Sequence, residues 1–182
     1  MNPKPQVMHM AETTDHDPSD SAVQRAIELA MLHRLGEQHP DWQRVTWKTL
    51  AAELGMSQVW QKAEPDAVWK TDSDEVIVAE SYARVGELKA GHRRKLAMDA
   101  LKLLALRDAL PGGNHVRCFL VVPEELIGRL RGDGWFPSAL RLASEVVPVA
   151  LLEGERKSLS DASMLQAQGQ ARTKRARKDR TE

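Results

Sequence analysis

Residues 65–82, with the sequence PDAVWKTDSDEVIVAESY, contain two short apolar runs and the polar cluster that joins them. The runs at residues 67–69 and 76–79 are rich in side chains that favour strands, and residues 71–74 between them have the composition of a turn. Two such runs with so short a link predict a β-hairpin.

The length of the loop sets which residues face each other across this hairpin. With residues 72–74 as the loop, Thr71 faces Glu75, and Asp66 lies opposite Glu80 on the same face. Their Cβ atoms are then about 5 Å apart. A two-residue loop would shift the register by one residue and send the two carboxylates to opposite faces.

The segments around the hairpin predict alternating helices and strands. Expected are helices at residues 20–36, 46–54 and 93–110, a strand at 116–122, helical turns at 124–131 and 138–144, and a last strand at 146–152. A strand, a long helix and a second apolar strand form a parallel βαβ unit, and Pro148 favours an edge position for the last strand. The fold class is therefore α/β, with a mixed sheet that contains a hairpin and a βαβ unit flanked by helices.

Composition limits the class of protein. A length of 182 residues with 42% hydrophobic content can build one domain, and the 26 basic and 26 acidic residues exclude a uniformly basic surface. A single cysteine, Cys118, excludes a disulfide within the chain. No apolar run reaches the roughly 20 residues of a membrane span, and no secretory leader is recognised. We expect a cytoplasmic protein without a membrane partner.

Both ends lack the periodic apolar pattern of the middle. Residues 1–19 are predicted to be a disordered acidic leader, residues 20–158 the folded domain, and residues 159–182 a disordered basic tail. We expect removal of both ends to leave thermal stability nearly unchanged.

Asp66 and Glu80 are the candidate chemical groups of the hairpin. Two acids that meet across a hairpin can share a hard divalent cation, which prefers carboxylate oxygens. Glu80 ends an apolar strand in a sheet expected to be buried, where a charge needs a partner or a metal. The alternative is that Asp66 caps a turn after Pro65 and Glu80 is the solvent end of its strand.

The order of elements, with Pro65-Asp66 followed by Glu80 at the end of an apolar strand, resembles the PD-(D/E)XK nuclease superfamily over residues 20–153. The resemblance implies a restriction-endonuclease-like fold, Mg²⁺ or Mn²⁺ bound by Asp66 and Glu80, and hydrolysis of DNA phosphodiesters. In that superfamily a lysine two residues after the glutamate helps to activate water. The chain has Tyr82 there, so the alternative function is a catalytically impaired module of this fold that binds nucleic acid or a protein partner.

Tyr82 is neutral at pH 7 and cannot replace the lysine charge. Lys89 and Lys95 are therefore the candidate catalytic cations. Arg84 ranks below them because an arginine does not deprotonate in proteins. We expect Arg84 on the same strand face as Tyr82. Glu28, on the first predicted helix, resembles an additional metal-binding acid found in some members. Its other interpretation is an ordinary glutamate on the solvent face.

Residues 84–95 (RVGELKAGHRRK) hold five basic residues and one acid, and His92 could add further positive charge. A basic segment beside the acids would collect phosphate, although it could equally be a solvated loop. The predicted nucleic-acid-binding residues are Arg84, Lys89, His92, Arg93, Arg94 and Lys95. DNA is the expected partner, and a homodimer or a protein partner is compatible with the sequence.

The tryptophans allow two interpretations. Core packing is favoured over base stacking for the early group, Trp42, Trp47, Trp60 and Trp69. Trp135 and Phe136 follow a glycine-rich turn and are predicted to anchor that loop onto the sheet.

Overall fold

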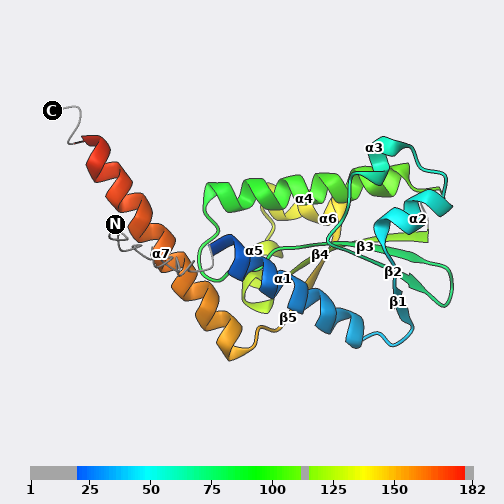
Figure 1. The fold of residues 1–182 in the computed structure, drawn as a ribbon, viewed down its shortest axis with the longest axis horizontal. Helices are drawn as coiled ribbons and strands as arrows, with labels where there is room; N and C mark the ends of the chain where they lie inside the picture. Colours follow the sequence, from blue (N-terminus) through cyan, green and yellow to red (C-terminus); the bar gives the residue numbers. More distant parts are fainter. Residues whose placement is uncertain (1–19, 112–114, 179–182) are drawn as a thin grey trace, which may run out of the picture.

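The computed structural model describes residues 20–111 and 115–178 (Figure 1). The predicted leader, residues 1–19, and the last four residues of the predicted tail lie outside them. The helices are α1 (Asp20–Glu37), α2 (Trp47–Glu53), α3 (Gln58–Gln61), α4 (Ala90–Ala109), the 3₁₀ turn η2 (Glu124–Leu126), α5 (Ile127–Leu130), α6 (Trp135–Ala143) and α7 (Glu153–Lys178). The strands are β1 (Trp42–Arg44), β2 (Ala67–Thr71), β3 (Val76–Ser81), β4 (Val116–Pro123) and β5 (Glu145–Val149).

The strands form one mixed sheet in the order β1-β2-β3-β4-β5. The pairs β1–β2 and β2–β3 are antiparallel, whereas β3–β4 and β4–β5 are parallel. The predicted hairpin and the predicted βαβ unit, β3–α4–β4, are both confirmed. Pro148 lies in β5 at the edge of the sheet, as its missing N–H group requires.

The hairpin has the predicted register. Ala67 pairs with Ala79 and Trp69 with Ile77, and the Thr71 N–H group donates to the Glu75 carbonyl oxygen at 3.0 Å. The three-residue loop ends at Asp74, whose φ of 65° is the left-handed conformation that such loops use at their last position. The next pair beyond Ala67 and Ala79 would be Asp66 and Glu80.

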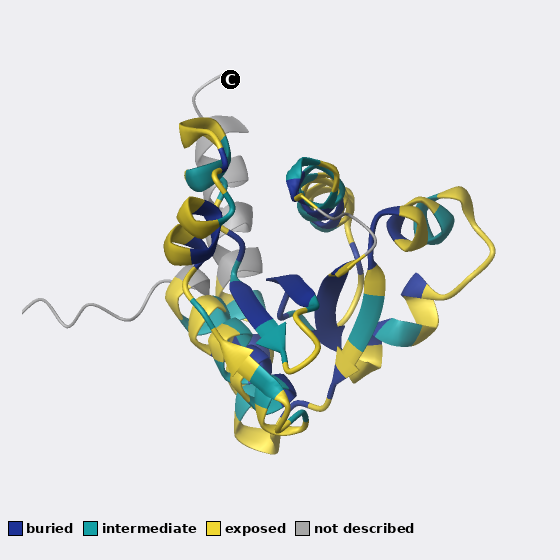
Figure 2. Cartoon of the chain, turned by 90° about the vertical axis from the view of Figure 1, so that its right-hand side faces the viewer, coloured by how far each residue is buried: buried dark blue, intermediate teal, exposed yellow. Residues whose placement is uncertain are grey.

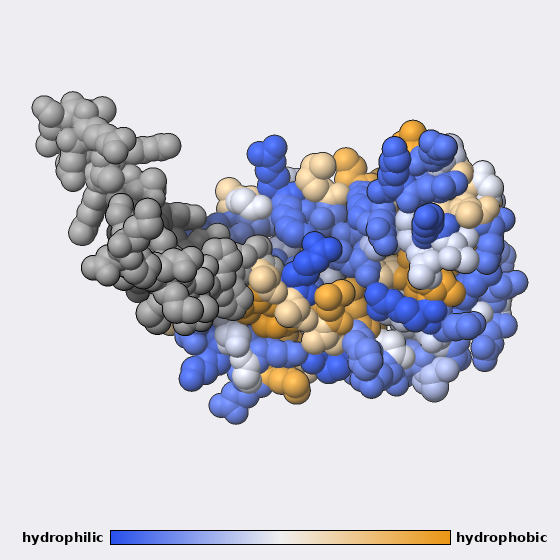
Figure 3. Space-filling model, viewed as in Figure 1, coloured by the Kyte–Doolittle hydropathy of each residue, from blue (hydrophilic) through white to orange (hydrophobic). Residues whose placement is uncertain are grey.

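Alternate residues of the central strands enter two separate core layers, one on each face of the sheet. Figure 2 shows that the central strands are mostly buried between the flanking helices. The α4-side core includes Val68, Val76, Val78, Leu96, Leu103, Leu106, Cys118, Leu120 and Leu140. The α1-side core includes Ile27, Met31, Leu32, Leu35, Trp69, Ile77, Phe119, Val121 and Leu159. Figure 1 shows α4 and α1 on opposite sides of the sheet, and Figure 3 shows a mostly hydrophilic outer surface in the same view.

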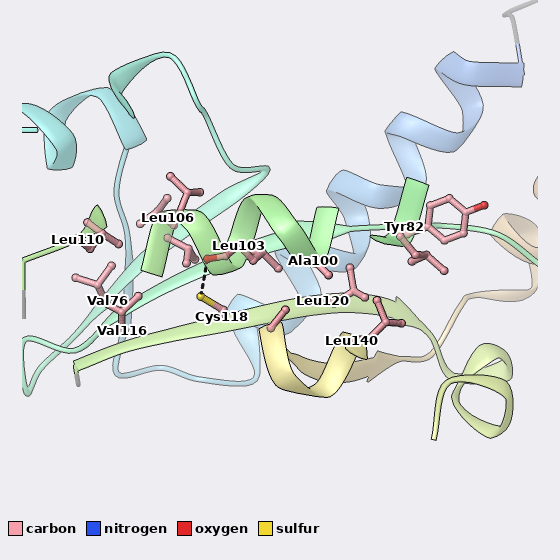
Figure 4. Close-up of a cluster of buried hydrophobic side chains, with 14 of the residues drawn as sticks. Val76, Tyr82, Ala100, Leu103, Leu106, Leu110, Val116, Cys118, Leu120 and Leu140 are labelled. Carbon is pink, nitrogen blue, oxygen red and sulfur yellow. Dashed lines mark hydrogen bonds between the residues drawn. The ribbon is translucent and has the colours of Figure 1, made fainter. Parts of the chain in front are cut away.

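Helix α4 covers its face of the sheet through Leu96, Ala100, Leu103 and Leu106, which are spaced by four, three and three residues. Figure 4 shows Leu103 and Leu106 directed toward β4, where the Cys118 thiol donates to the Leu103 carbonyl oxygen at 3.4 Å. Burial raises the pKa of this thiol to about 11, so it is protonated at neutral pH. Cys118 therefore belongs to the packed core, as the apolar sequence around it predicts.

Helix α7 differs from the predicted disordered tail, because it continues through Ser158 to Lys178. The Arg34 guanidinium on α1 contacts the Glu155 carboxylate with both terminal nitrogens at 2.8 Å. Leu159 is 4% exposed and packs in the α1-side core. The folded unit thus extends beyond the boundary predicted at residue 158, because one apolar residue after it completes that core.

We expect Leu159→Ala to lower the free energy of unfolding by about 2–3 kcal/mol, since it opens a cavity in a buried layer. Leu165→Ala is the matched control in the same helix, because Leu165 is 56% exposed. Urea denaturation followed by circular dichroism measures both. Equal stabilities of the two variants would show that α7 does not contribute to the core.

The helices described for this chain include none with the length and apolar character needed to cross a membrane.

Candidate functional site

Asp66 immediately precedes β2, and Glu80 is the penultimate residue of β3. Oδ2 of Asp66 accepts two hydrogen bonds from Ser81, one from the backbone N–H group at 2.8 Å and one from the hydroxyl at 3.0 Å. These bonds fix the Asp66 carboxylate against the end of β3. The structure therefore brings the predicted acid to the strand that carries Glu80.

Glu80 is only 4% exposed, and it lies on the α4 side of the sheet. Burial first, and the nearby negative charge of Asp66 second, raise the pKa of its carboxyl group to about 7. Its Oε1 atom lies 2.6 Å from Nζ of Lys102, although the contact is poorly directed for a hydrogen bond. Glu80 is therefore not the solvent end of a strand, but a buried acid with one cationic partner.

Lys102 is the partner of Glu80 and is not among the residues that the sequence predicts. It lies in α4, and its Nζ also donates to the Glu64 carbonyl oxygen at 2.5 Å. Lys95, Asp99 and Lys102 follow one another at intervals of four and three residues, which places them on one face of the helix. The spacing could have identified Lys102, because Lys102 lies two helical turns after Lys95, which is a predicted site residue.

Lys95 lies in the same cluster and has its own acidic partner. Its Nζ donates to Oδ2 of Asp99 at 2.8 Å and lies 5.5 Å from the centre of the Tyr82 ring. Burial alone would lower the pKa of Lys95, but the hydrogen bond and the charge of Asp99 outweigh it and raise the pKa. Lys95 is thus a fixed positive charge beside Tyr82.

Tyr82, at the position of the superfamily lysine, is 2% exposed and packs in the α4-side core. Burial raises the pKa of its hydroxyl group to about 12. The hydroxyl group is consequently neutral throughout the physiological range, as the sequence predicts for tyrosine.

Glu28 connects α1 to the segment that follows β3. Its Oε1 accepts the Ala83 backbone N–H group at 3.1 Å and the Gln24 side-chain amide at 2.8 Å. Burial raises the pKa of its carboxyl group, and the charge of Asp66 acts in the same direction. Glu28 is therefore a half-buried acid near the other carboxylates rather than an ordinary solvent-face residue.

The predicted metal ligands are the acidic side chains Asp66, Glu80 and Glu28. Within residues 20–111 and 115–178, no group of three or more acidic, histidine or cysteine side chains is arranged to hold a metal ion. Asp66 and Glu80 are held at the ends of adjacent strands, and Mg²⁺ commonly binds one or two carboxylates and keeps several waters. A role for Glu28 as a third ligand stays a prediction.

A cavity of about 630 Å³ opens between the start of α1, the residues after β3 and the start of α4, and its lining includes Glu28 but neither Asp66 nor Glu80. It is lined by Ala22, Gln24, Arg25, Glu28, Tyr82, Arg84, Lys89, Gly91, His92 and Lys95. Four of the predicted nucleic-acid-binding residues therefore meet there, together with Arg25, which the sequence did not indicate. We call this the basic cavity.

Arg84 lines the basic cavity, but it does not lie on the strand of Glu80, where the sequence predicts it. Strand β3 ends at Ser81, so the strand pattern that would align Arg84 with Glu80 stops before it. The Nε atom of Arg84 is buried and has no hydrogen-bond partner among the described residues.

The other basic residues near the start of α4 do not all share this cavity. Arg93 lines a separate cavity, and Arg94 is exposed on the helix surface. Helix α4 begins at Ala90, three residues before the predicted start, and the Lys89 N–H group donates to Nδ1 of His92 at 3.1 Å. Burial, followed by the charge of Arg84, lowers the pKa of His92. His92 therefore does not add the positive charge expected of it at neutral pH.

No protein-family model, curated protein or solved structure matches this chain.

Proposed function

We propose that the protein is a divalent-metal-dependent nuclease with a restriction-endonuclease-like fold, which acts on DNA phosphodiesters. The observations that carry this proposal are the β2–β3 register, which would next pair Asp66 with the buried Glu80, and the two hydrogen bonds that hold Asp66 against Ser81. Mg²⁺ or Mn²⁺ is the cofactor that these oxygen ligands would take.

The electrostatics of the two acids support a cation between them. The negative charge of Asp66 raises the pKa of Glu80, so the two carboxylates repel each other when both are ionised. A divalent cation would remove this repulsion, and it would supply a polarised water and charge stabilisation at the phosphate. Ser81 would keep Asp66 oriented through its two hydrogen bonds.

Lys102 is the best-placed residue to take the role of the displaced lysine. Its Nζ is in contact with Glu80, whereas Nζ of Lys95 is paired with Asp99. Lys89 begins α4 and lines the basic cavity, a position suited to phosphate binding. In this assignment Lys102 stabilises charge beside the scissile phosphate, and Lys89 and Lys95 help to hold the strand.

The basic cavity would bind the DNA backbone. Arg25, Arg84, Lys89 and Lys95 line it against the single acid Glu28. Arg84 lines this cavity, and a guanidinium group is a strong donor to phosphate oxygens.

The proposal is tested by cleavage of duplex and single-stranded DNA with Mg²⁺ or Mn²⁺, and with EDTA as the metal-free control. We expect wild type to cleave only with metal, and Lys102→Ala to lose about 10²- to 10³-fold in rate. Lys95→Ala and Lys89→Ala should lose less, because those residues are assigned to binding. Lys70→Ala is the matched control, since Lys70 pairs with Asp74 at the opposite end of the hairpin.

Two results would contradict the proposal. Activity that is equal in wild type and in all variants would indicate a contaminating nuclease. No cleavage by wild type with either metal, together with cleavage by Tyr82→Lys, would identify an impaired nuclease-fold module that binds nucleic acid or a protein partner. The buried, neutral Tyr82 is the observation that favours this second function.

A further inference from the structure

A second cavity, of about 670 Å³, lies between the loop before α4 and the start of α6. It is lined by Glu87, Leu88, Arg93, Arg129, Gly132, Gly134, Trp135, Phe136 and Pro137. We call it the aromatic cavity. Its walls combine large aromatic surface with two arginines and one acid.

Trp135 is the unusual residue of this cavity. It is 82% exposed, although the sequence predicted that it would anchor its loop onto the sheet. Trp47 and Trp69, by contrast, are each 2% exposed and lie in the core layers. Trp135 contacts Phe136 edge to face, with ring centres 5.8 Å apart, so a flat face of the indole ring is available to a ligand.

The two arginines give the aromatic cavity a preference for anionic ligands. Arg93 on α4 and Arg129 on α5 are both exposed, and they outnumber the one acid of the lining, Glu87. An aromatic face with adjacent guanidinium groups is the combination that binds an unpaired base together with its phosphate. A purely apolar ligand would leave both arginines unused.

The two cavities lie on either side of the first turn of α4. Lys89 and His92 face the basic cavity, whereas Arg93 lines the aromatic cavity. Figure 1 shows α5 and the start of α4 at the same end of the molecule. A strand with its phosphates in the basic cavity can therefore continue around this turn toward Trp135. In a duplex the base faces are already stacked, so only an unpaired base can use the indole.

We infer that the aromatic cavity binds an unpaired nucleobase by stacking on Trp135, with Arg93 and Arg129 on the adjoining phosphates. This inference rests on the proposed function for its ligand, and it narrows the substrate to nucleic acid with a single-stranded stretch next to the cleaved bond.

The test measures binding, not cleavage. Fluorescence anisotropy of a labelled single-stranded DNA 12-mer in EDTA compares wild type with Trp135→Ala, Trp135→Phe and Leu142→Ala. We expect Trp135→Ala to weaken binding by about 5- to 100-fold and Trp135→Phe to retain most of the affinity. Leu142→Ala is the control, because Leu142 is 78% exposed on the same helix, and it should bind like wild type. Single-stranded RNA and duplex DNA are measured in parallel.

Each outcome decides one statement. Binding by Trp135→Ala equal to that of wild type would overturn the stacking site, even if wild type cleaves DNA. If Trp135→Ala weakens the binding of duplex DNA as much as that of single-stranded DNA, the site is not restricted to unpaired bases. Trp135-dependent binding by a protein that cleaves nothing with Mg²⁺ or Mn²⁺ would support the site and contradict the nuclease.

Discussion

Replacement of Asp66 by asparagine should abolish metal-dependent cleavage and leave the fold intact. The amide has the shape of the carboxylate, and its oxygen can still accept the bonds from Ser81. It lacks the negative charge that a divalent cation requires, so we expect a loss of about 10³-fold or more in cleavage rate. Initial rates with Mg²⁺ and Mn²⁺ measure the effect, and the thermal midpoint verifies the fold.

The matched control for this substitution is Asp74→Asn. Asp74 lies in the loop at the other end of the same hairpin, its side chain is 91% exposed, and asparagine tolerates its positive φ. This variant should cleave at the wild-type rate. If Asp66→Asn also cleaves at that rate, Asp66 is not a metal ligand and the proposed site is wrong.

Glu80→Gln should make the protein more stable at pH 8 and should remove most of the pH dependence near neutrality. The pKa of Glu80 rises from 4.5 to about 7 on folding, so the native state binds the proton more tightly than the unfolded state. Stability from the protonated carboxyl group is complete below pH 4.5 and is lost as pH rises through 7. The loss is on the order of 3 kcal/mol.

Urea denaturation of wild type and Glu80→Gln at pH 5, 6, 7 and 8 measures this difference. Glu53→Gln is the control, because Glu53 is exposed on α2. Addition of Mn²⁺ at pH 8 should stabilise wild type more than Glu80→Gln, since only wild type has both carboxylates. A wild-type stability that rises between pH 5 and 8, with no such rise in Glu80→Gln, would show that Glu80 is stabilised in its ionised form.

The part of the site that the sequence predicts well depends on local chemistry. The polar loop of residues 72–74 defines the hairpin register, and the register places Asp66 level with Glu80. The apolar run that ends at Glu80 likewise predicts its burial. Both inferences use residues that are close in the chain, where strand alternation and loop length restrict the geometry.

The missed parts depend on contacts between distant segments. Lys102 reaches Glu80 because α4 packs on β3 with a particular rotation about its axis. The apolar pattern of α4 predicts which face of the helix is buried, but it does not predict which residues the polar side chains beside that face will contact. Helix α7 is polar along most of its length, so its sequence has no apolar stripe that would predict its packing on the domain through Glu155 and Leu159. The short strand β1 carries only three residues, too few for alternation to identify.

The division of the sheet into an α4-side core and an α1-side core has a consequence for how the chain unfolds. Val76 and Val78 point into one layer, and Ile77 points into the other, so the same strand supplies both. Removal of either layer of helices would expose apolar side chains along the central strands and weaken the remaining layer. We therefore expect the two layers to unfold together, so that the domain unfolds as a single cooperative unit despite having two separate hydrophobic interiors.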